Sequence, residues 1–98
     1  MSTWYMYVVE CADDTLYTGI TTDVSRRIRE HNHTAQGARY TRSRRPVELV
    51  GAWAYPDQSE AASSEYAFKE LSRSEKIEVL REDLSFRGAD PVEEISEA

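Results

Sequence analysis

The hydrophobic pattern near the start of the chain predicts a β-hairpin. Residues 4–11 are rich in aromatic and β-branched side chains, and within them Glu10 is the single charged residue. A run that is apolar at both odd and even positions is typical of a central strand covered on two sides. Residues 12–14 favour a turn, and residues 16–20 then predict the returning strand.

The length of the hairpin loop decides on which face of the sheet two tyrosines lie. A two-residue loop would place Tyr7 and Tyr17 on opposite faces, whereas a three-residue loop over 12–14 places both on one face and pairs Tyr7 with Gly19. The longer loop needs one residue with a positive φ, which Asp14 tolerates better than most residues. We predict this loop, and we expect Gly19 to leave an unfilled notch beside Tyr7 where a substrate backbone can approach.

The periodicity after the hairpin predicts a helix and a third strand. Asp23 offers an N-cap, and its carboxylate suits the positive end of the helix dipole. The helix is expected to end at about Asn32. Residues 33–46 are then expected to form a loop, and residues 47–55 alternate between apolar and polar positions as a strand does.

Two further helices are predicted in the second half of the chain. Ser59 is the expected N-cap of a helix over residues 60–71, and Glu65 falls inside the apolar arc of this helix, where a carboxylate needs a partner. Residues 72–75 (Ser-Arg-Ser-Glu) form a capping box that opens the last helix. The apolar stripe of that helix comprises Ile77, Leu80 and Leu84.

These elements predict one domain of the α/β (α+β) class over residues 1–86. Its architecture is a three-stranded antiparallel sheet flanked by helices, in the order β-β-α-β-α-α. A chain of 98 residues suffices for one modest core. Residues 87–98 are rich in Gly, Pro and acids and are expected to form an acidic, flexible tail.

Composition narrows the class of protein. The chain has no run of about 18 apolar residues and no basic-then-apolar leader, and its single cysteine, Cys11, fits a reducing compartment. We therefore expect a cytoplasmic protein without a membrane segment. Acids outnumber bases, and ten of the twelve bases are arginines. An acid-rich, lysine-poor surface suits a salt-loaded cytoplasm, so we also expect a halophilic origin.

The net charge of −6 argues at first against a nucleic-acid partner. However, seven arginines and a single acid, Glu30, occur within residues 26–45, and the rest of the chain is acidic. The chain thus has one basic region in an otherwise acidic sequence, and this region favours contact with a phosphate backbone.

A set of short motifs extends from the hairpin to the last helix. They are Trp4-Tyr5, residues 17–23 (YTGITTD), Arg26-Arg27, Glu30-His31-Asn32, residues 38–42 (ARYTR), residues 44–50 (RRPVELV), Glu65 and residues 69–73 (KELSR). In these motifs the chain resembles small single-domain proteins of the GIY-YIG nuclease family. The resemblance covers most of the chain, and Tyr5 stands where the glycine of the first triplet often sits.

The resemblance implies an endonuclease or phosphodiesterase that uses one divalent metal ion, Mg²⁺ or Mn²⁺. Tyr7 matches the general base, and Tyr17 would hydrogen-bond the phosphate or assist Tyr7. Arg27 would neutralise charge on the phosphate, and His31 would relay a proton or bind phosphate. Glu65 matches the metal ligand. We expect nearby cations such as Arg27 or the metal to lower the pKa of Tyr7 by about two units, which takes roughly 2.7 kcal/mol.

The implied partner is DNA, and RNA remains an alternative. No separate DNA-reading domain is evident, so we expect selection of nucleic-acid structure rather than of base sequence. The cations and the aromatic ring expected to contact nucleic acid are Arg26, Arg39, Tyr40, Arg42, Arg44 and Arg45.

Two other interpretations stay open. The family carries an asparagine after the metal glutamate in many nucleases, whereas the last predicted helix has Ile77 and Glu78 there. The runner-up is a nucleic-acid-binding module with little or no turnover, and the third option is a purely structural domain. In those cases Arg27 would pair with Glu30 or Asp23, and Glu65 would form an i,i+4 ion pair with Lys69.

Overall fold

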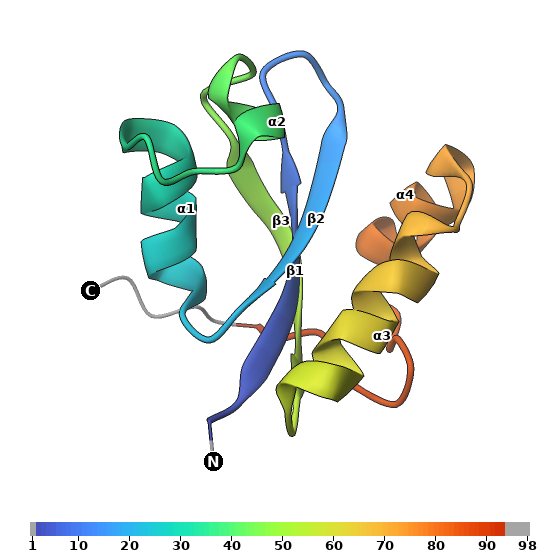
Figure 1. The fold of residues 1–98 in the computed structure, drawn as a ribbon. Coiled ribbons are helices and arrows are strands. Elements are labelled where there is room, and N and C mark those ends of the chain that lie inside the picture. The colour runs from blue at the N-terminus through green and yellow to red at the C-terminus, as the bar shows by residue number, and fades with distance from the viewer. Residues whose placement is uncertain (1, 94–98) are drawn as a thin grey trace.

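A computed structural model describes residues 2–93 and shows a three-stranded antiparallel sheet with the strand order β2-β1-β3 (Figure 1). Its elements are β1 (Trp4–Glu10), β2 (Leu16–Thr21), α1 (Val24–His33), α2 (Arg39–Arg42), β3 (Glu48–Tyr55), α3 (Gln58–Lys69) and α4 (Arg73–Arg81). The predicted order of elements is confirmed, with the short helix α2 as an addition. No helix within residues 2–93 is long and apolar enough to cross a membrane.

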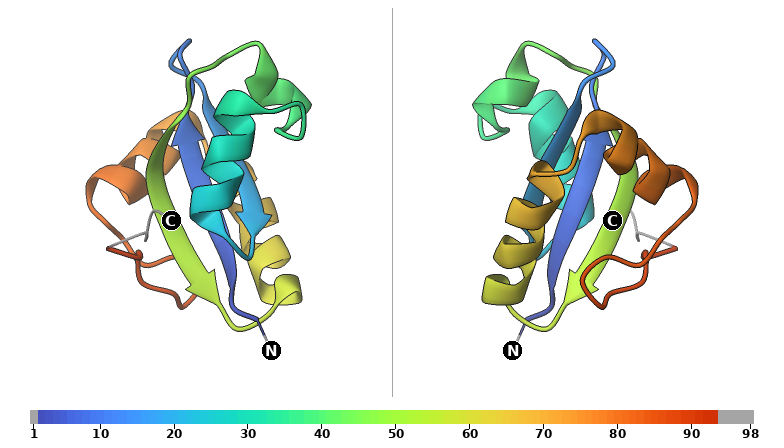
Figure 2. Two further views of the ribbon diagram at one scale, coloured as in Figure 1. Left: turned by 90° about the vertical axis from the view of Figure 1, so that its left-hand side faces the viewer. Right: turned by 90° about the vertical axis from the view of Figure 1, so that its right-hand side faces the viewer.

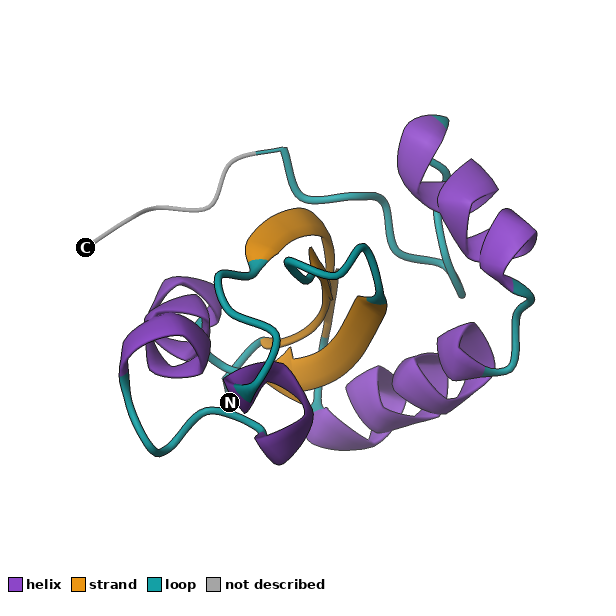
Figure 3. Ribbon diagram, turned by 90° about the horizontal axis from the view of Figure 1, so that it is seen from above, coloured by secondary structure: helices purple, strands orange, loops and turns teal. Residues whose placement is uncertain are grey.

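Helices cover both faces of the sheet, α1 on one side and α3 with α4 on the other (Figures 1 and 2). The central strand β1 is apolar on both sides for this reason. Met6 and Val8 join the core under α3 and α4, which is centred on Trp53 and Phe68, and Tyr7 belongs to the core under α1. Seen from above, the strands lie between the helical layers (Figure 3).

The hairpin has the predicted register. Tyr7 pairs with Gly19 across β1 and β2, and Asp14 adopts a φ of 67° in the loop. The N–H of Cys11 donates to the carbonyl of Thr15 at 2.8 Å, which closes the three-residue loop. Tyr7 and Tyr17 therefore share the face that α1 covers.

The helix caps confirm two predictions and correct a third. The carboxylate of Asp23 accepts the N–H of Arg26 at the start of α1, and residues 72–75 form the capping box of α4. The N-cap of α3 is Asp57 rather than Ser59, because the helix begins two residues earlier than predicted and Asp57 accepts the N–H of Glu60. Leu84 lies beyond the end of α4 and is not part of its stripe.

Part of the predicted tail belongs to the folded domain. Pro91 forms a bridge with Trp53, the N–H of Val92 donates to the carbonyl of Ala52 at 2.8 Å, and Ala89 is buried. Pro91 and Val92 lie along the outer edge of β3, so the folded domain continues past the boundary expected at residue 86. Residues 94–98 of the predicted tail lie outside the described residues.

Candidate active site

The tyrosine of β1 is the centre of the predicted site. Tyr7 is 1% exposed, and its ring crosses over Gly19 of β2. A Cβ at Gly19 would lie 2.6 Å from Tyr7 Oη, so the absence of a side chain makes room for the ring. The predicted open notch is therefore wrong, because the tyrosine itself fills it. The ring is aimed across β2, and its hydroxyl meets α1.

The hydroxyl of Tyr7 contacts a buried histidine. Tyr7 Oη lies 2.7 Å from His31 Nε2, and His31 Nδ1 lies 2.9 Å from Thr41 Oγ1. The backbone N–H of Ala38 also donates to Nδ1 at 3.2 Å. Burial of the ring, together with the positive charge of nearby arginines, lowers the pKa of His31 to about 4. His31 is thus neutral near pH 7 with both ring nitrogens engaged, an arrangement that leaves no nitrogen open for the expected phosphate contact.

Arg27 joins the same group of side chains from one turn earlier on α1. Its Nη1 donates to Glu30 Oε1 at 3.0 Å and to the carbonyl of Gln36 at 2.8 Å. The guanidinium also lowers the pKa of Tyr7 through its charge and its hydrogen bonding to the phenol. The ion pair with Glu30 and a place beside Tyr7 are therefore compatible, since the pair holds the guanidinium in position.

The pKa of Tyr7 itself departs from our expectation. Burial raises it well above its ordinary value of 10, the charges of Tyr17 and Glu65 raise it further, and Arg27 lowers it by less. The expected net lowering is thus wrong for the protein alone, because loss of hydration outweighs one neighbouring cation. Tyr7 is a neutral phenol in this structure and needs additional positive charge before it can act as a base.

Glu65 projects from α3, which packs against β2 and β1. Its side chain is 24% exposed, and Oε2 lies 3.1 Å from Lys69 Nζ, which is the partner that its place in the apolar arc required. Carboxylate oxygens suit Mg²⁺ or Mn²⁺, which take further ligands from water and phosphate. Within residues 2–93 no three His, Cys, Asp or Glu side chains are grouped to hold a metal ion. Glu65 would therefore be a lone protein carboxylate, and Lys69 would have to leave it.

Aromatic rings extend the site from the buried histidine to the surface. The ring of Tyr17 meets His31 edge-on at a centroid distance of 5.4 Å and stacks on Tyr40 at 5.7 Å. The guanidinium of Arg44 lies 4.0 Å from the centroid of the Tyr40 ring, and its Nε is 3.0 Å from Asp13 Oδ2 in the hairpin loop. Tyr40 is 39% exposed. The stack thus links Tyr7 and His31 to a cation at the surface.

The remaining predicted cations divide into two groups. Arg26 and Arg39 are exposed, and Arg26 lies 3.9 Å from Glu30. Arg42 donates to the carbonyl of Ala35, and Arg45 donates to the carbonyls of His31 and Thr34 at the end of α1. The arginines of the second group hold the segment between α1 and β3 together, so contact with phosphate would compete with this role.

Sequence reasoning missed the backbone that surrounds His31. Thr41 lies in α2, a helix of four residues that is too short to show a periodic pattern. Gly37 is buried against α1, and a Cβ there would lie 2.6 Å from the carbonyl oxygen of Glu30. A single glycine in a polar stretch is the only signal in the sequence, and it is equally typical of an ordinary loop.

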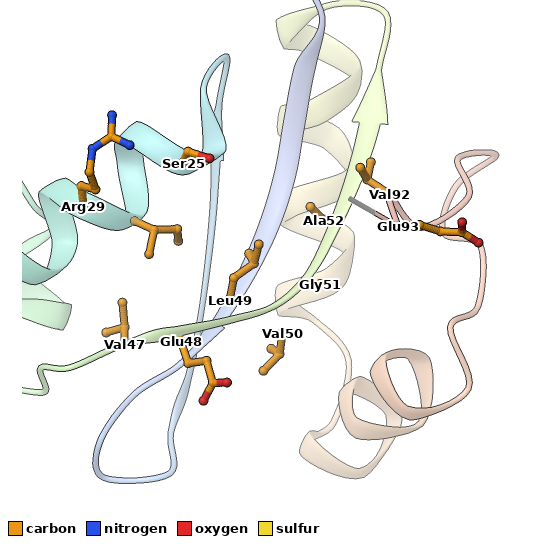
Figure 4. Close-up of a pocket in the computed structure, with 11 residues that line it drawn as sticks. Ser25, Arg29, Val47, Glu48, Leu49, Val50, Gly51, Ala52, Val92 and Glu93 are labelled. Atoms are coloured by element: carbon orange, nitrogen blue, oxygen red, sulfur yellow. The ribbon is translucent and has the colours of Figure 1, made fainter. Parts of the chain in front are cut away.

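A groove of about 710 Å³ lies on the same face of the sheet, between α1 and β3 (Figure 4). None of the residues that line it belongs to the predicted site. Its charged side chains are Arg29, Glu48 and Glu93, and it lacks a tyrosine or histidine. We therefore do not assign the predicted chemistry to it.

Comparison with known proteins gives one consistent result. The family model of the GIY-YIG catalytic domain matches residues 3–78. A UPF0213 protein of Desulfotalea psychrophila is 62% identical over 78 residues, which cover 80% of this chain and 71% of that protein. One of Haloquadratum walsbyi is 49% identical and covers 80% and 86%. The solution structure of a UPF0213 protein of Bacillus halodurans matches with 47% identity and a TM-score of 0.53, covering 81% of this chain and 83% of that one.

Proposed function

This chain belongs to the family of GIY-YIG catalytic domains, and from that membership we propose that it is a metal-dependent endonuclease that hydrolyses DNA. One observation carries the proposal. The buried hydroxyl of Tyr7 is held between His31 and Arg27, on the face that also carries Tyr17. The negative charge of Glu65 also acts on the same phenol, from α3, which packs against β2 and β1.

Hydrolysis of a phosphodiester needs a base for water and positive charge around the phosphate. In our proposal Tyr7 Oη takes the proton of the attacking water, and Arg27 neutralises charge on the phosphate with its planar guanidinium. Tyr17 donates a hydrogen bond to a phosphate oxygen. Glu65 would hold Mg²⁺ or Mn²⁺, which supplies Lewis-acid charge at the phosphate and the leaving oxygen.

The raised pKa of Tyr7 sets a condition on this proposal. A phenol with the ordinary pKa is ionised in about one molecule in a thousand at pH 7, and burial makes ionisation rarer still. Tyr7 therefore works as a base only in the loaded complex. We therefore expect slow turnover when the site is not fully occupied by metal and substrate. The same condition supports the second candidate function, a nucleic-acid-binding module with little turnover.

In our proposal the surface beside the stacked rings of Tyr17 and Tyr40 contacts the rest of the substrate. Arg26 and Arg39 are exposed for phosphate contact, and Arg44 over Tyr40 offers a cation with an aromatic ring. These groups engage backbone and shape rather than base edges, so we propose selection by nucleic-acid structure, with RNA as an alternative substrate.

The test is cleavage of labelled single-stranded, nicked, flapped and junction DNA with Mg²⁺ or Mn²⁺ over a range of salt concentrations. We expect the natural chain to cleave, and we expect Tyr7→Phe and Glu65→Ala to lose cleavage while they keep DNA binding. Tyr66→Phe is a matched control because Tyr66 is 69% exposed on α3. Equal cleavage by all variants would point to a contaminant and refute the site.

Two other outcomes separate the alternatives. Binding that weakens with salt, without cleavage by any form, would favour the binding module. If replacement of Arg39 and Arg44 by Gln left nucleic-acid binding unchanged, a purely structural domain would be the better account.

The composition supports a proposal about the cellular environment. Cys11 is buried and its pKa is raised by burial, so it is an inert thiol that suits a reducing cytoplasm. The acid-rich, lysine-poor surface suits high internal salt. If the origin is halophilic, the free energy of unfolding falls on dialysis from molar to low salt, and an unchanged value would remove this proposal.

A further inference from the structure

The hydrogen bond between Tyr7 and His31 has two possible directions, and the surroundings of the imidazole decide between them. A neutral imidazole carries its proton on one ring nitrogen only. If the proton is on Nε2, His31 donates to Tyr7 Oη. If it is on Nδ1, the phenol donates to Nε2 and His31 could accept the proton of Tyr7. Both nitrogens are within hydrogen-bond distance of oxygen atoms, at 2.7 and 2.9 Å, so distance alone leaves the direction open.

The backbone N–H of Ala38 favours the first direction because it cannot rotate. It points at His31 Nδ1 from 3.2 Å, and an N–H donor requires a nitrogen without a proton there. The hydroxyl of Thr41 adapts to either case, since it lies 2.9 Å from both Nδ1 and the carbonyl oxygen of Ala38. A proton on Nδ1 would leave the Ala38 N–H facing another donor in a buried site, which is costly.

Gly37 brings this N–H into place. A Cβ at Gly37 would lie 2.6 Å from the carbonyl oxygen of Glu30 and 2.7 Å from the Cα of His31, so any other residue would push the segment away from α1. The carbonyl of Gln36, the residue before Gly37, accepts a hydrogen bond from Nη1 of Arg27 at 2.8 Å. The backbone of residues 36–38 therefore contacts both the arginine and the histidine of the site.

We propose that Gly37 and Ala38 are positioning residues that lock His31 as the Nε2–H tautomer, so that His31 is a permanent hydrogen-bond donor to Tyr7 and not a proton relay. The catalytic meaning of this lock rests on the proposed function, whereas the tautomer itself does not. The cleavage step starts from the phenolate, after the loaded site has released the Tyr7 proton to solvent. One O–H bond of water then breaks and the Tyr7 Oη–H bond forms, while the water oxygen bonds to phosphorus, the bond from phosphorus to the leaving oxygen breaks, and the leaving oxygen takes a proton from solvent. The Nε2–H bond of His31 stays intact. The donated hydrogen bond stabilises the phenolate form of Tyr7.

The direct test is a long-range proton–nitrogen NMR spectrum of the ¹⁵N-labelled full chain at pH 7.5. We expect the Nδ1 of His31 to have the shift of an unprotonated nitrogen and Nε2 that of an N–H. His33, the only other histidine and an exposed one, serves as the internal reference for a ring that exchanges between tautomers. A proton found on Nδ1 of His31 would overturn the proposal.

Variants show whether the N–H of Ala38 or the hydroxyl of Thr41 determines the tautomer of His31. Gly37→Ala moves the Ala38 N–H away, and we expect His31 to lose its single tautomer, whereas Ala38→Gly keeps the N–H and is expected to leave the tautomer unchanged. Thr41→Val should leave the proton on Nε2. A shift of the proton in Thr41→Val but not in Gly37→Ala would show that the hydroxyl sets the tautomer, and it would refute the role given to the backbone.

Cleavage assays show whether His31 acts as a hydrogen-bond donor or as a proton relay. Glutamine can donate an N–H towards Tyr7 but cannot carry a proton onward, and phenylalanine can do neither. We expect His31→Gln to cleave at least about tenfold faster than His31→Phe, the range expected of a hydrogen bond to a charged group. Equal loss in both, by about 10²-fold or more, would indicate a relay. If the natural chain does not cleave, the proposed function fails, but the NMR result still decides the tautomer.

Discussion

Mild acid should destabilise this protein through His31. The imidazole is fully buried beside Arg27 and Arg45, and these conditions oppose its protonation in the folded state. The pKa of His31 is therefore about 4 in the folded protein, against an ordinary value of 6.5 in the unfolded chain. Between these two values the unfolded chain binds a proton that the folded protein does not.

The direction in which stability changes with pH follows from proton linkage. Stability rises with pH wherever the unfolded state binds more protons, so the contribution of His31 is complete above pH 6.5 and is lost as the pH falls towards 4. A drop in pKa from 6.5 to about 4 corresponds to about 3 kcal/mol when the loss is complete. About 2 kcal/mol of this is lost by pH 5. A small domain has about 5–15 kcal/mol of stability in all, so the effect is measurable.

The assay is urea unfolding at pH 7.5 and pH 5, followed by tryptophan fluorescence, since Trp53 is 1% exposed in the core. The natural chain should lose about 2 kcal/mol between these conditions, and His31→Gln should lose much less. The pKa values of Asp13 and Glu75 are lowered by their hydrogen bonds with Thr15 and Ser72, so these carboxylates titrate below the interval. An equal loss in the natural chain and the variant would refute the reasoning.

Three further predictions concern other parts of the molecule. Gly19→Ala should displace the ring of Tyr7, cost about 1–3 kcal/mol of stability and reduce cleavage by about 10²-fold, as measured by unfolding and by the DNA assay; unchanged cleavage would show that the ring has room to move. Phe68→Ala should cost about 3–5 kcal/mol in urea unfolding, because Phe68 contacts the rings of Trp53 and Phe86; a cost below 1 kcal/mol would contradict the packing described. Glu65→Gln should weaken Mn²⁺ binding in calorimetry, because it removes the proposed carboxylate ligand; unchanged Mn²⁺ binding would remove Glu65 from the metal site.

The parts of the fold that local chemistry determines could be predicted from the sequence. The register of the hairpin follows from the loop length and from the tolerance of Asp14 for a positive φ, and the capping box at residues 72–75 defines the start of α4 without reference to the rest of the chain. Both depend on a few neighbouring residues. The N-cap of α3 was misplaced because Asp57 and Ser59 are both good caps, two residues apart, and local preference alone does not choose between them.

The environment of the site could not be predicted in the same way. The proximity of Tyr7, His31 and Arg27 follows from the family resemblance and the spacing along the hairpin and helix. The direction of the Tyr7 pKa shift, however, depends on how deeply the ring is buried, and burial is a property of the packed layers. The contact between the Ala38 N–H and His31 comes from the path of a short backbone segment, which no side-chain pattern records.

The segment that completes the edge of β3 has a consequence for how the protein is made. The ribosome releases a chain from its N-terminus at about 5–20 residues per second, so all three strands emerge before residues 84–93. The indole N–H of Trp53 donates to the carbonyl of Leu84, and the hydroxyl of Tyr55 donates to that of Phe86. A nascent chain that pauses before this segment therefore presents a paired sheet with an uncovered edge and two donors without these acceptors. We therefore expect the nascent chain to be more exposed to aggregation than the finished protein.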